Sequence, residues 1–235
     1  HAHPPALVSF SIVRQIPNTN VIPQAKHICG GIGYAPYQLP GSVGLGKVIA
    51  DEFEKGFEAV IMENHGTVVG GTDLKDAFPR FETLEFCCRT ILYGNMIGTP
   101  NYLTDAQIEE FEAQLPHLLP EMKEVEHPSE ERAIREEIVR IVHRACSQGL
   151  MISSYGTVSV RWSGNDFLIT PTGESRWDIQ IEDIVQIRNG KREKGKIPSR
   201  ATWLHQEIYR RYPHINSIIL TQTPYLKTYS VTAKN

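Results

Sequence analysis

The chain has 235 residues and a formal net charge of −3 at pH 7, with 40% hydrophobic and 22% charged residues, which is typical of a globular protein. No apolar run approaches the roughly 20 residues that span a bilayer, and the basic cluster 191–196 is interrupted and lacks aromatics, so we expect neither membrane nor nucleic-acid binding. Four cysteines without C-x-x-C spacing indicate reduced thiols and a cytoplasmic location. The sequence has no signal peptide, but because it begins with His1 rather than Met, this absence is weak evidence about location.

The first predicted elements are a strand end and a helix. The opening segment 1–12 is predicted to be a strand end that runs into a short apolar stretch, because Pro4 and Pro5 would break a helix there. Apolar residues at helical spacing then predict a helix over 44–54, which Gly56 would end as a C-cap.

Two strands and a long helix follow. The apolar runs 58–63 and 67–70 predict strands on either side of a tight turn that carries His65. A three- and four-residue apolar spacing then predicts a helix over 73–97, with Thr72 as its N-cap.

The second half of the chain repeats the mixed pattern after a Pro- and Glu-rich run. That run, 116–130, is predicted to be a linker. Ser129 opens a helix that Gly149 ends, and a further helix is predicted from Pro198 or Ser199 to Arg211. Strands are predicted at 158–161, 167–170, 184–187 and 215–220.

Three histidines are candidate metal ligands. A strand directs residues i and i+2 to the same face, so His1 and His3 can aim two imidazoles at one point. Catalytic zinc usually takes three protein ligands, and His65 is the candidate third because Gly66 lets the backbone bend close to an ion. The alternatives are that the first two belong to a purification tag and that His65 is an ordinary turn residue.

A second group of candidates lies in three turns rich in small residues. These turns offer main-chain N–H groups, hydroxyls and a guanidinium, which are the components of a phosphate site. Ordinary β-turn chemistry is the alternative, because the same residue types populate turns for conformational reasons. The candidate phosphate ligands are Gly156, Thr157, Ser159, Thr172, Gly173, Ser199 and Arg200.

The ordered motifs resemble the class II aldolase/adducin family of sugar-phosphate enzymes. Segment 1 to about 98 is similar to the second half of a family domain, beginning at His1–Pro4 and including the Glu63–Gly66 turn. Segment 131–235 is similar to the first half of such a domain. Together these segments cover roughly four fifths of the chain.

The two segments overlap at one strand, which suggests a tandem protein. Residues 1–4 align with residues 221–224, a displacement of 221 − 1 = 220 residues. The resemblance therefore implies a first half-domain over 1–115 that carries the metal ligands, a linker over 116–130, and a second half-domain over 131–235 with a degenerate site. Either the halves complement one another or residues outside this chain complete both.

The resemblance also implies a fold and a chemistry. The family fold is of the α/β (α+β) type, with a central, mostly antiparallel sheet covered by helices, and it assembles as a homo-oligomer. By position, His1, His3 and His65 would hold Zn²⁺, which stabilises an enediolate formed from a sugar phosphate.

Several positions depart from the family pattern. The family's catalytic glutamate falls at Ala201 in the second half and would lie upstream of the first, so the catalytic acid/base is unknown. Thr221 and Thr223 replace two metal ligands, and Thr157 replaces the asparagine of the glycine-rich turn. Ile22 lies near the place of a family tyrosine that helps protonate the substrate.

Three functions remain open from the sequence. The leading hypothesis is a zinc-dependent aldolase that cleaves a ketose 1-phosphate to dihydroxyacetone phosphate and an aldehyde. An adducin-like module for binding and self-association is the second, because the second site has lost its ligands. A sugar-phosphate epimerase or dehydratase is the third, because such relatives use the same metal site.

Overall fold

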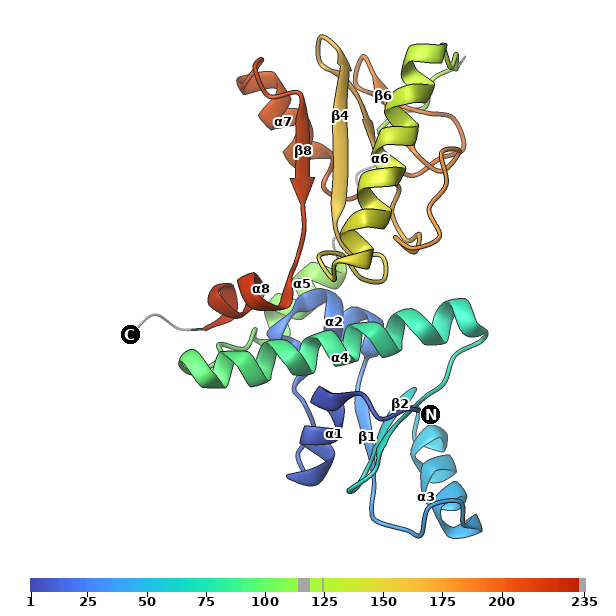
Figure 1. Ribbon diagram of the computed structural model, residues 1–235, viewed down its shortest axis with the longest axis vertical. Helices are drawn as coiled ribbons and strands as arrows, with labels where there is room; N and C mark the ends of the chain where they lie inside the picture. The colour runs from blue at the N-terminus through green and yellow to red at the C-terminus, as the bar shows by residue number, and fades with distance from the viewer. Residues whose placement is uncertain (114–118, 124, 233–235) are drawn as a thin grey trace. The chain divides into compact units, whose positions relative to one another are not determined.

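The computed structural model describes residues 1–113, 119–123 and 125–232. The chain forms two compact units, the first made of His1–Gln114 with Pro224–Asn235 and the second of Leu115–Thr223 (Figure 1). The predicted mixed α/β class and mostly antiparallel strand pairing are confirmed, with one sheet in each unit. Within the described residues, no helix has the length and apolar character needed to cross a membrane.

The first unit is built on a three-stranded sheet with the order β1-β2-β3. Its strands are β1 (Ile32–Ala35), β2 (Ala59–Met62) and β3 (Gly66–Val69), with β1 parallel and β3 antiparallel to β2. All four β2 side chains are buried, as expected for a central strand with a continuous apolar run. Helix α3 (Val43–Glu54) packs on the sheet through a core that includes Leu45.

Short helices begin a few residues after the N-terminus, which corrects one prediction. Residues Pro5–Ile12 form helix α1, although the two prolines were predicted to prevent a helix there. Pro4 is the N-cap and Pro5 occupies the first turn, where the missing N–H group has no helical partner to lose. A 3₁₀ turn, η1 (Thr19–Val21), and helix α2 (Pro23–Cys29) come next.

The longest helix of the first unit is α4 (Leu74–Ile97). Its N-cap is Asp73, whose carboxylate accepts a hydrogen bond from the Asp76 N–H group at 2.9 Å. The predicted cap, Thr72, instead donates to the Asp76 carboxylate from its own N–H group at 3.0 Å. Helix α5 (Asp105–Ala113) follows.

The second unit is built on a five-stranded antiparallel sheet with the order β7-β6-β5-β4-β8. Its strands are β4 (Thr157–Ser163), β5 (Asp166–Ile169), β6 (Val185–Arg188), β7 (Lys191–Arg192) and β8 (Ser217–Leu220). Strand β7 lies at the start of the basic cluster 191–196, where no strand was predicted. Its residue Arg192 instead pairs with Ile187, because the β6–β7 hairpin extends the sheet edge.

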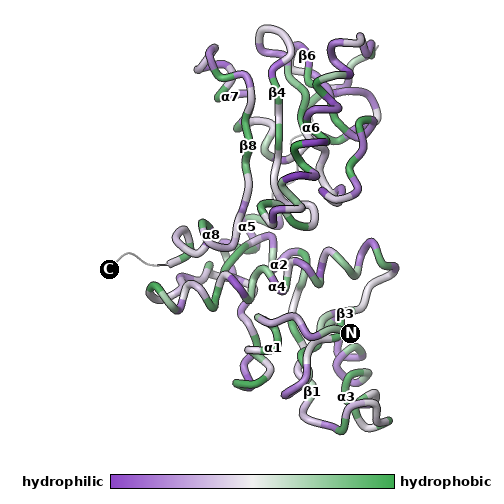
Figure 2. Tube along the Cα trace, in the orientation of Figure 1, coloured by the Kyte–Doolittle hydropathy of each residue, from purple (hydrophilic) through white to green (hydrophobic). Residues whose placement is uncertain are grey.

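Helices cover both faces of this sheet. Helix α6 (Ser129–Ser147) packs on one face against Leu168, and hydrophobic and hydrophilic residues alternate along it (Figure 2). Helix α7 (Thr202–Arg211) packs on the other face, where Tyr209 meets Phe167. Neighbouring residues of β5 thus enter different cores, as the two-residue period of a strand requires.

The unit boundaries differ from the predicted ones. In the predicted linker, Leu119 and Met122 are buried, and Leu119 joins the core of the second unit, so this stretch is packed structure. Residues 116–118 and 124 lie outside the described residues. Helix α8 (Pro224–Val231) belongs to the first unit, where Tyr225 stacks on Tyr93 of α4 with ring centroids 5.0 Å apart.

Candidate metal centre and phosphate site

The first unit brings the three candidate histidines together through its sheet. Ala2 forms an antiparallel bridge with Thr67 of β3, with N–O distances of 3.1 and 3.0 Å between their main chains. His1 and His3 therefore flank a residue that is anchored at the start of β3. His65 lies in the turn immediately before that strand. We call these three residues the histidine triad.

The turn before β3 can hold this geometry because of Asn64 and Gly66. Asn64 adopts a left-handed conformation with φ 53°, which asparagine tolerates better than most residues. A Cβ atom on Gly66 would collide with the carbonyl oxygen of Ala2 and would come within 2.8 Å of the His3 ring. The close approach of the two chain segments thus requires glycine at position 66.

The triad has distances suited to one metal ion. The Nε2 atom of His1 lies 3.3 Å from the Nε2 atoms of both His3 and His65. The possible ligand atoms of the three residues all lie within 4.8 Å of one another. Ligands bound tetrahedrally to zinc at about 2.0–2.1 Å lie about 3.3–3.4 Å apart, so two of the three separations match such a site.

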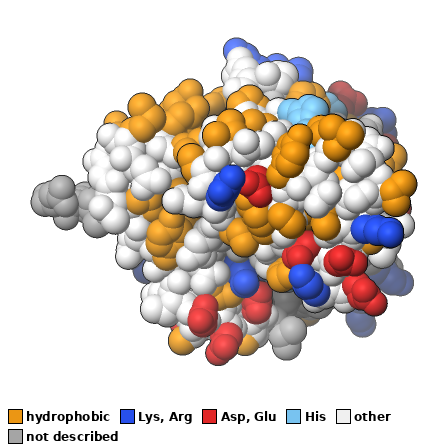
Figure 3. Space-filling view, turned by 90° about the horizontal axis from the view of Figure 1, so that it is seen from below, with side chains coloured by type: hydrophobic (Ala, Val, Ile, Leu, Met, Phe, Trp, Pro, Cys, Tyr) orange, Lys and Arg blue, Asp and Glu red, His pale blue; other side chains and the backbone are white. Residues whose placement is uncertain are grey.

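The chemistry of the triad also fits a cation. The Nε2 atom of His1 faces two other ring nitrogens but has only one proton to donate or, in the other tautomer, only one lone pair to accept with, so one of these contacts lacks a full hydrogen bond in the uncharged triad. A metal ion would accept all three lone pairs. The rings of His1 and His3 are exposed and that of His65 is half-buried, which leaves an open side, and histidine side chains are visible at the surface in Figure 3.

Glu63 anchors the turn that carries His65, and sequence reasoning missed it. Its carboxylate accepts a hydrogen bond from the Tyr37 N–H group at 3.0 Å and pairs with Arg14 at 2.6 Å. The Glu63 side chain is only 13% exposed. No local pattern in the sequence links these residues, which lie 26 and 49 positions from Glu63.

Glu85 of α4 fixes the helix that follows His3. Its carboxylate accepts hydrogen bonds from the N–H groups of Ala6 at 3.3 Å and Leu7 at 3.1 Å. These donors belong to the first turn of α1, which has no side-chain cap of its own. Arg89 pairs with the same carboxylate at 2.8 Å. The segment after the candidate ligands is therefore held by a residue about 80 positions away.

The second unit brings the three predicted phosphate-binding turns together. The hydroxyls of Thr157 and Ser199 are hydrogen-bonded at 2.7 Å. The Ser199 N–H group donates to Thr170 at 3.0 Å, and the Thr172 N–H group donates to Ile197 at 3.1 Å. We call the assembly of turns 156–157, 170–173 and 198–200 the three-turn cluster. Gly173 and Arg200 are exposed at it, and Gly156 is half-buried.

Ser159 does not join this cluster, which corrects its predicted place among the phosphate ligands. It is fully buried, and its hydroxyl lies 2.6 Å from His205 Nδ1 and 2.7 Å from the Tyr209 hydroxyl. Strand β4 directs it beneath α7, where both partners reside. Burial lowers the pKa of His205 to about 4, so this imidazole is neutral near pH 7.

The positions that match the family's catalytic and metal-binding residues carry other chemistry in the second unit. Ala201 is the N-cap of α7 and offers only a methyl group. The Thr221 hydroxyl donates to the carbonyl oxygen of Leu150, and Thr223 is buried. Neither threonine offers the imidazole nitrogen that its counterpart in the first unit provides.

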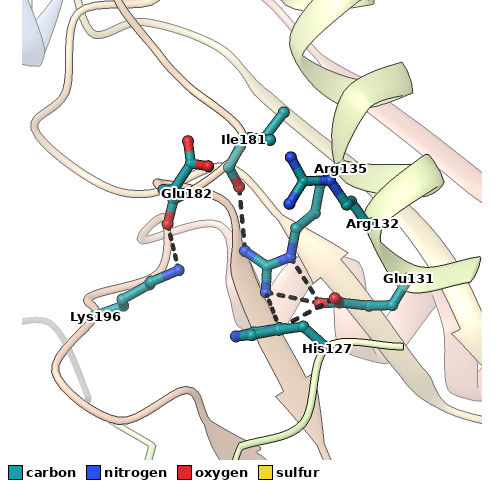
Figure 4. A pocket seen from close by; sticks show the side chains of 7 residues that line it. All are labelled: His127, Glu131, Arg132, Arg135, Ile181, Glu182 and Lys196. Carbon is teal, nitrogen blue, oxygen red and sulfur yellow. Dashed lines mark hydrogen bonds and ion pairs between the residues drawn. The ribbon is translucent and has the colours of Figure 1, made fainter. Parts of the chain in front are cut away.

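A cavity of about 250 Å³ in the second unit is lined by charged residues (Figure 4). Its lining is His127, Glu131, Arg132, Arg135, Ile181, Glu182 and Lys196. Arg135 lies 2.7 Å from Glu131 and 2.7 Å from Glu193, and His127 lies 3.0 Å from Glu131. Because these charges neutralise one another, we interpret the group as a structural ionic cluster that joins α6 to the β6–β7 hairpin.

The protein is thus an α/β protein of two units, one of which carries a candidate three-histidine metal site. The sequence profile of the family described as "Class II Aldolase and Adducin N-terminal domain" matches residues 1–92 and 136–235. The chain therefore belongs to the class II aldolase and adducin family.

Several curated proteins are similar over part of their length. The L-fuculose phosphate aldolase of Methanococcus vannielii is 35% identical over 99 residues, which is 42% of this chain and 54% of that protein. The methylthioribulose-1-phosphate dehydratase of Pectobacterium atrosepticum is 32% identical over 88 residues, 37% of this chain and 43% of the relative. The 3-oxo-tetronate 4-phosphate decarboxylase of Haemophilus influenzae is 30% identical over 118 residues, 48% of this chain and 54% of the relative. The chain thus spans about half the length of these relatives.

Solved structures show partial similarity as well. YgbL from Klebsiella pneumoniae matches with a TM-score of 0.39 and 27% identity, over 42% of this chain and 48% of its own. An L-fuculose 1-phosphate aldolase matches with a TM-score of 0.38 and 26% identity, over 40% of this chain and 45% of its own.

Proposed function

We propose that this chain is the metal-binding part of a zinc-dependent aldolase that acts on a ketose 1-phosphate. The reaction is a retro-aldol cleavage that gives dihydroxyacetone phosphate and an aldehyde. The observation that carries the proposal is the convergence of His1, His3 and His65, with the Nε2 atom of His1 3.3 Å from that of each of the other two, in a member of a family that includes sugar-phosphate aldolases.

The triad's task is to hold the ion with one side open. Zinc bound there would supply Lewis-acid chemistry toward the carbonyl and hydroxyl oxygens of the ketose. The imidazoles contribute neutral lone pairs from two chain segments, and Gly66 lets those segments approach. Glu63 holds the turn of His65 through Tyr37 and Arg14, which keeps the third ligand in register with the first two.

On this proposal, the three-turn cluster of the second unit is itself a phosphate-binding site. Thr157 and Ser199 supply hydroxyls, Thr172 and Gly173 supply turn backbone, and Arg200 supplies charge. Ala201 cannot transfer a proton, so the general acid/base is not assigned within this chain. The protein acts as a cytoplasmic homo-oligomer, as the family resemblance implies.

Two alternatives have specific support. The similarity to a dehydratase and a decarboxylase favours another sugar-phosphate reaction at the same metal site. The loss of ligands at Thr221 and Thr223 favours a binding module of the adducin kind, at least for the second unit.

The test combines metal analysis with a product assay on the full-length protein that contains this chain. We expect one zinc ion per triad in the wild type, loss of that zinc in His65→Ala, and no change in the control His214→Ala, whose imidazole is exposed in the second unit. Release of dihydroxyacetone phosphate from a ketose 1-phosphate supports cleavage. Zinc content unaffected by His65→Ala would rule the proposal out, whereas zinc binding without that product would leave a dehydratase, epimerase or binding module.

A further inference from the structure

Arg176 is a buried arginine that neither the sequence motifs nor the proposed mechanism uses. Its side chain is among the largest fully buried ones, with 2% of the residue exposed. Nε donates to the Gly156 carbonyl at 2.9 Å, Nη2 to the Pro171 carbonyl at 3.0 Å, and Nη1 to the Glu174 carbonyl at 2.8 Å. The main-chain N–H group of Arg176 donates to Ser153 at 2.7 Å. One guanidinium thus joins several loop segments.

These segments are those of the three-turn cluster. Gly156 precedes Thr157, and Pro171 and Glu174 belong to or adjoin the second turn. The third turn is joined to the second by an antiparallel bridge between Pro171 and Pro198. Removing the guanidinium would therefore take away the direct link between the first and second turns and leave them joined through their hydrogen bonds to the third turn.

The charge of Arg176 is not neutralised by an ion pair in the described part of the chain. Its hydrogen-bond acceptors are main-chain carbonyls, whereas Arg135, also buried, lies between two carboxylates. Burial lowers the pKa of Arg176 to about 10, and the nearby Cys146 and Glu174 partly offset that effect. The side chain therefore keeps its positive charge at neutral pH.

A buried charge without an ion pair is costly for folding alone, which points to an external counter-charge. Main-chain carbonyls could be satisfied by a neutral donor such as a glutamine amide, so the hydrogen bonds do not by themselves require a cation. We propose that Arg176 is a positioning residue for a phosphate group at the three-turn cluster. It holds the turns in place and supplies positive charge from beneath them. This inference rests on the proposed phosphate role of the second unit.

The test measures binding of inorganic phosphate to the full chain, freed of metal, by calorimetry at low ionic strength. Arg176→Gln keeps a donor without the charge, and Arg176→Lys keeps the charge without the planar fork. The control is Arg140→Gln, which removes the same charge from an exposed position on α6 where the side chain is 67% exposed. Ser199→Ala identifies the three-turn cluster as the place of binding.

We expect phosphate affinity about tenfold weaker in Arg176→Gln, about threefold weaker in Arg176→Lys, and unchanged in Arg140→Gln. Binding by the wild type should weaken with added salt more steeply than binding by Arg176→Gln. Equal losses in the lysine and glutamine variants would overturn the inference, because a purely structural arginine would be replaced equally badly by both.

The outcomes separate this inference from the function on which it rests. A wild type that binds no phosphate, or whose binding survives Ser199→Ala, would remove the phosphate role of the second unit and the inference with it. If the wild type binds phosphate, Ser199→Ala weakens that binding and Arg176→Gln leaves the affinity unchanged, only the inference about Arg176 is ruled out. If Arg176→Gln does not fold, the salt dependence of phosphate binding by Arg176→Lys decides. This variant keeps the charge, so its affinity must fall with added salt as steeply as that of the wild type, and a shallower dependence would overturn the inference.

Discussion

The two units carry aligned strand ends that have opposite chemistry. In the first, His1–Pro4 leads into helix α1, whereas the second ends at Thr221–Thr223 and the chain continues into helix α8, which belongs to the first unit. In both places an extended segment is followed by a helix that begins at a proline. The side chains differ, because two imidazoles face a third in the first unit while the Thr221 hydroxyl is hydrogen-bonded to its own unit.

The difference concerns which polar groups are satisfied by the protein itself. The ring nitrogens of the histidine triad face one another and cannot all form hydrogen bonds with each other, which is why we propose a cation at that site. The charges of the ionic cluster in the second unit have partners within it. We therefore expect substitutions at the triad to change metal binding with little loss of stability, and substitutions in the ionic cluster to do the reverse.

The largest expected effect is in the ionic cluster. Arg135→Met leaves Glu131 and Glu193 buried without their shared cation and should reduce the free energy of unfolding by about 3–5 kcal/mol. Urea denaturation measures this loss, and zinc content should stay at the wild-type level. The exposed neighbour Arg132→Met is the matched control. A stability change below about 1 kcal/mol in Arg135→Met would contradict the view that this unit satisfies its own charges.

Acid should weaken the second unit through His205. The folded-state pKa is about 4 against about 6.5 in the unfolded chain, so the unfolded state binds more protons between these values. Stability should fall as the pH drops from about 6.5 to about 4, by up to about 3 kcal/mol from this residue. Denaturation at several pH values compares the wild type with His205→Gln, which should show a flatter dependence. The slope should be unaffected by His214→Gln.

At the histidine triad, we expect zinc affinity to depend on the close approach of the segment 1–3 to the turn at Gly66. Gly66→Ala places a methyl group against Ala2 and His3 and should weaken zinc binding about a hundredfold, as measured by competition with a chelator. Gly46→Ala, at a helical position with open space around the new Cβ, should keep wild-type affinity. Equal affinities in the two variants would show that the observed approach is not needed for the ion.

The smallest expected effect tests a cap that the sequence placed one residue too early. Asp73→Ala removes the carboxylate that accepts from the Asp76 N–H group and should cost about 1 kcal/mol in thermal or urea unfolding. Thr72→Ala should cost less, because its hydroxyl only reaches the Asp76 side chain, at 3.4 Å. The reverse order would restore Thr72 as the N-cap.

Local patterns in the sequence determined much of the architecture. Helical spacing located α3, α4 and α6, and the apolar runs on either side of His65 located β2 and β3. The i, i+2 relation of His1 and His3 also indicated a common point for two rings. These features depend on residues close in sequence, whose preferences act through one turn or one strand.

Only the tertiary structure decided the partners that lie far apart in the chain. Glu85 caps α1, Arg176 links two turns of the three-turn cluster, and Ser159 lies in the core beside His205. Helix α8 likewise belongs to the first unit because of a contact between distant residues, the stacking of Tyr225 on Tyr93. Such contacts follow from how whole elements pack, and the identity of a carboxylate or a guanidinium does not reveal which distant carbonyl or N–H group it will meet.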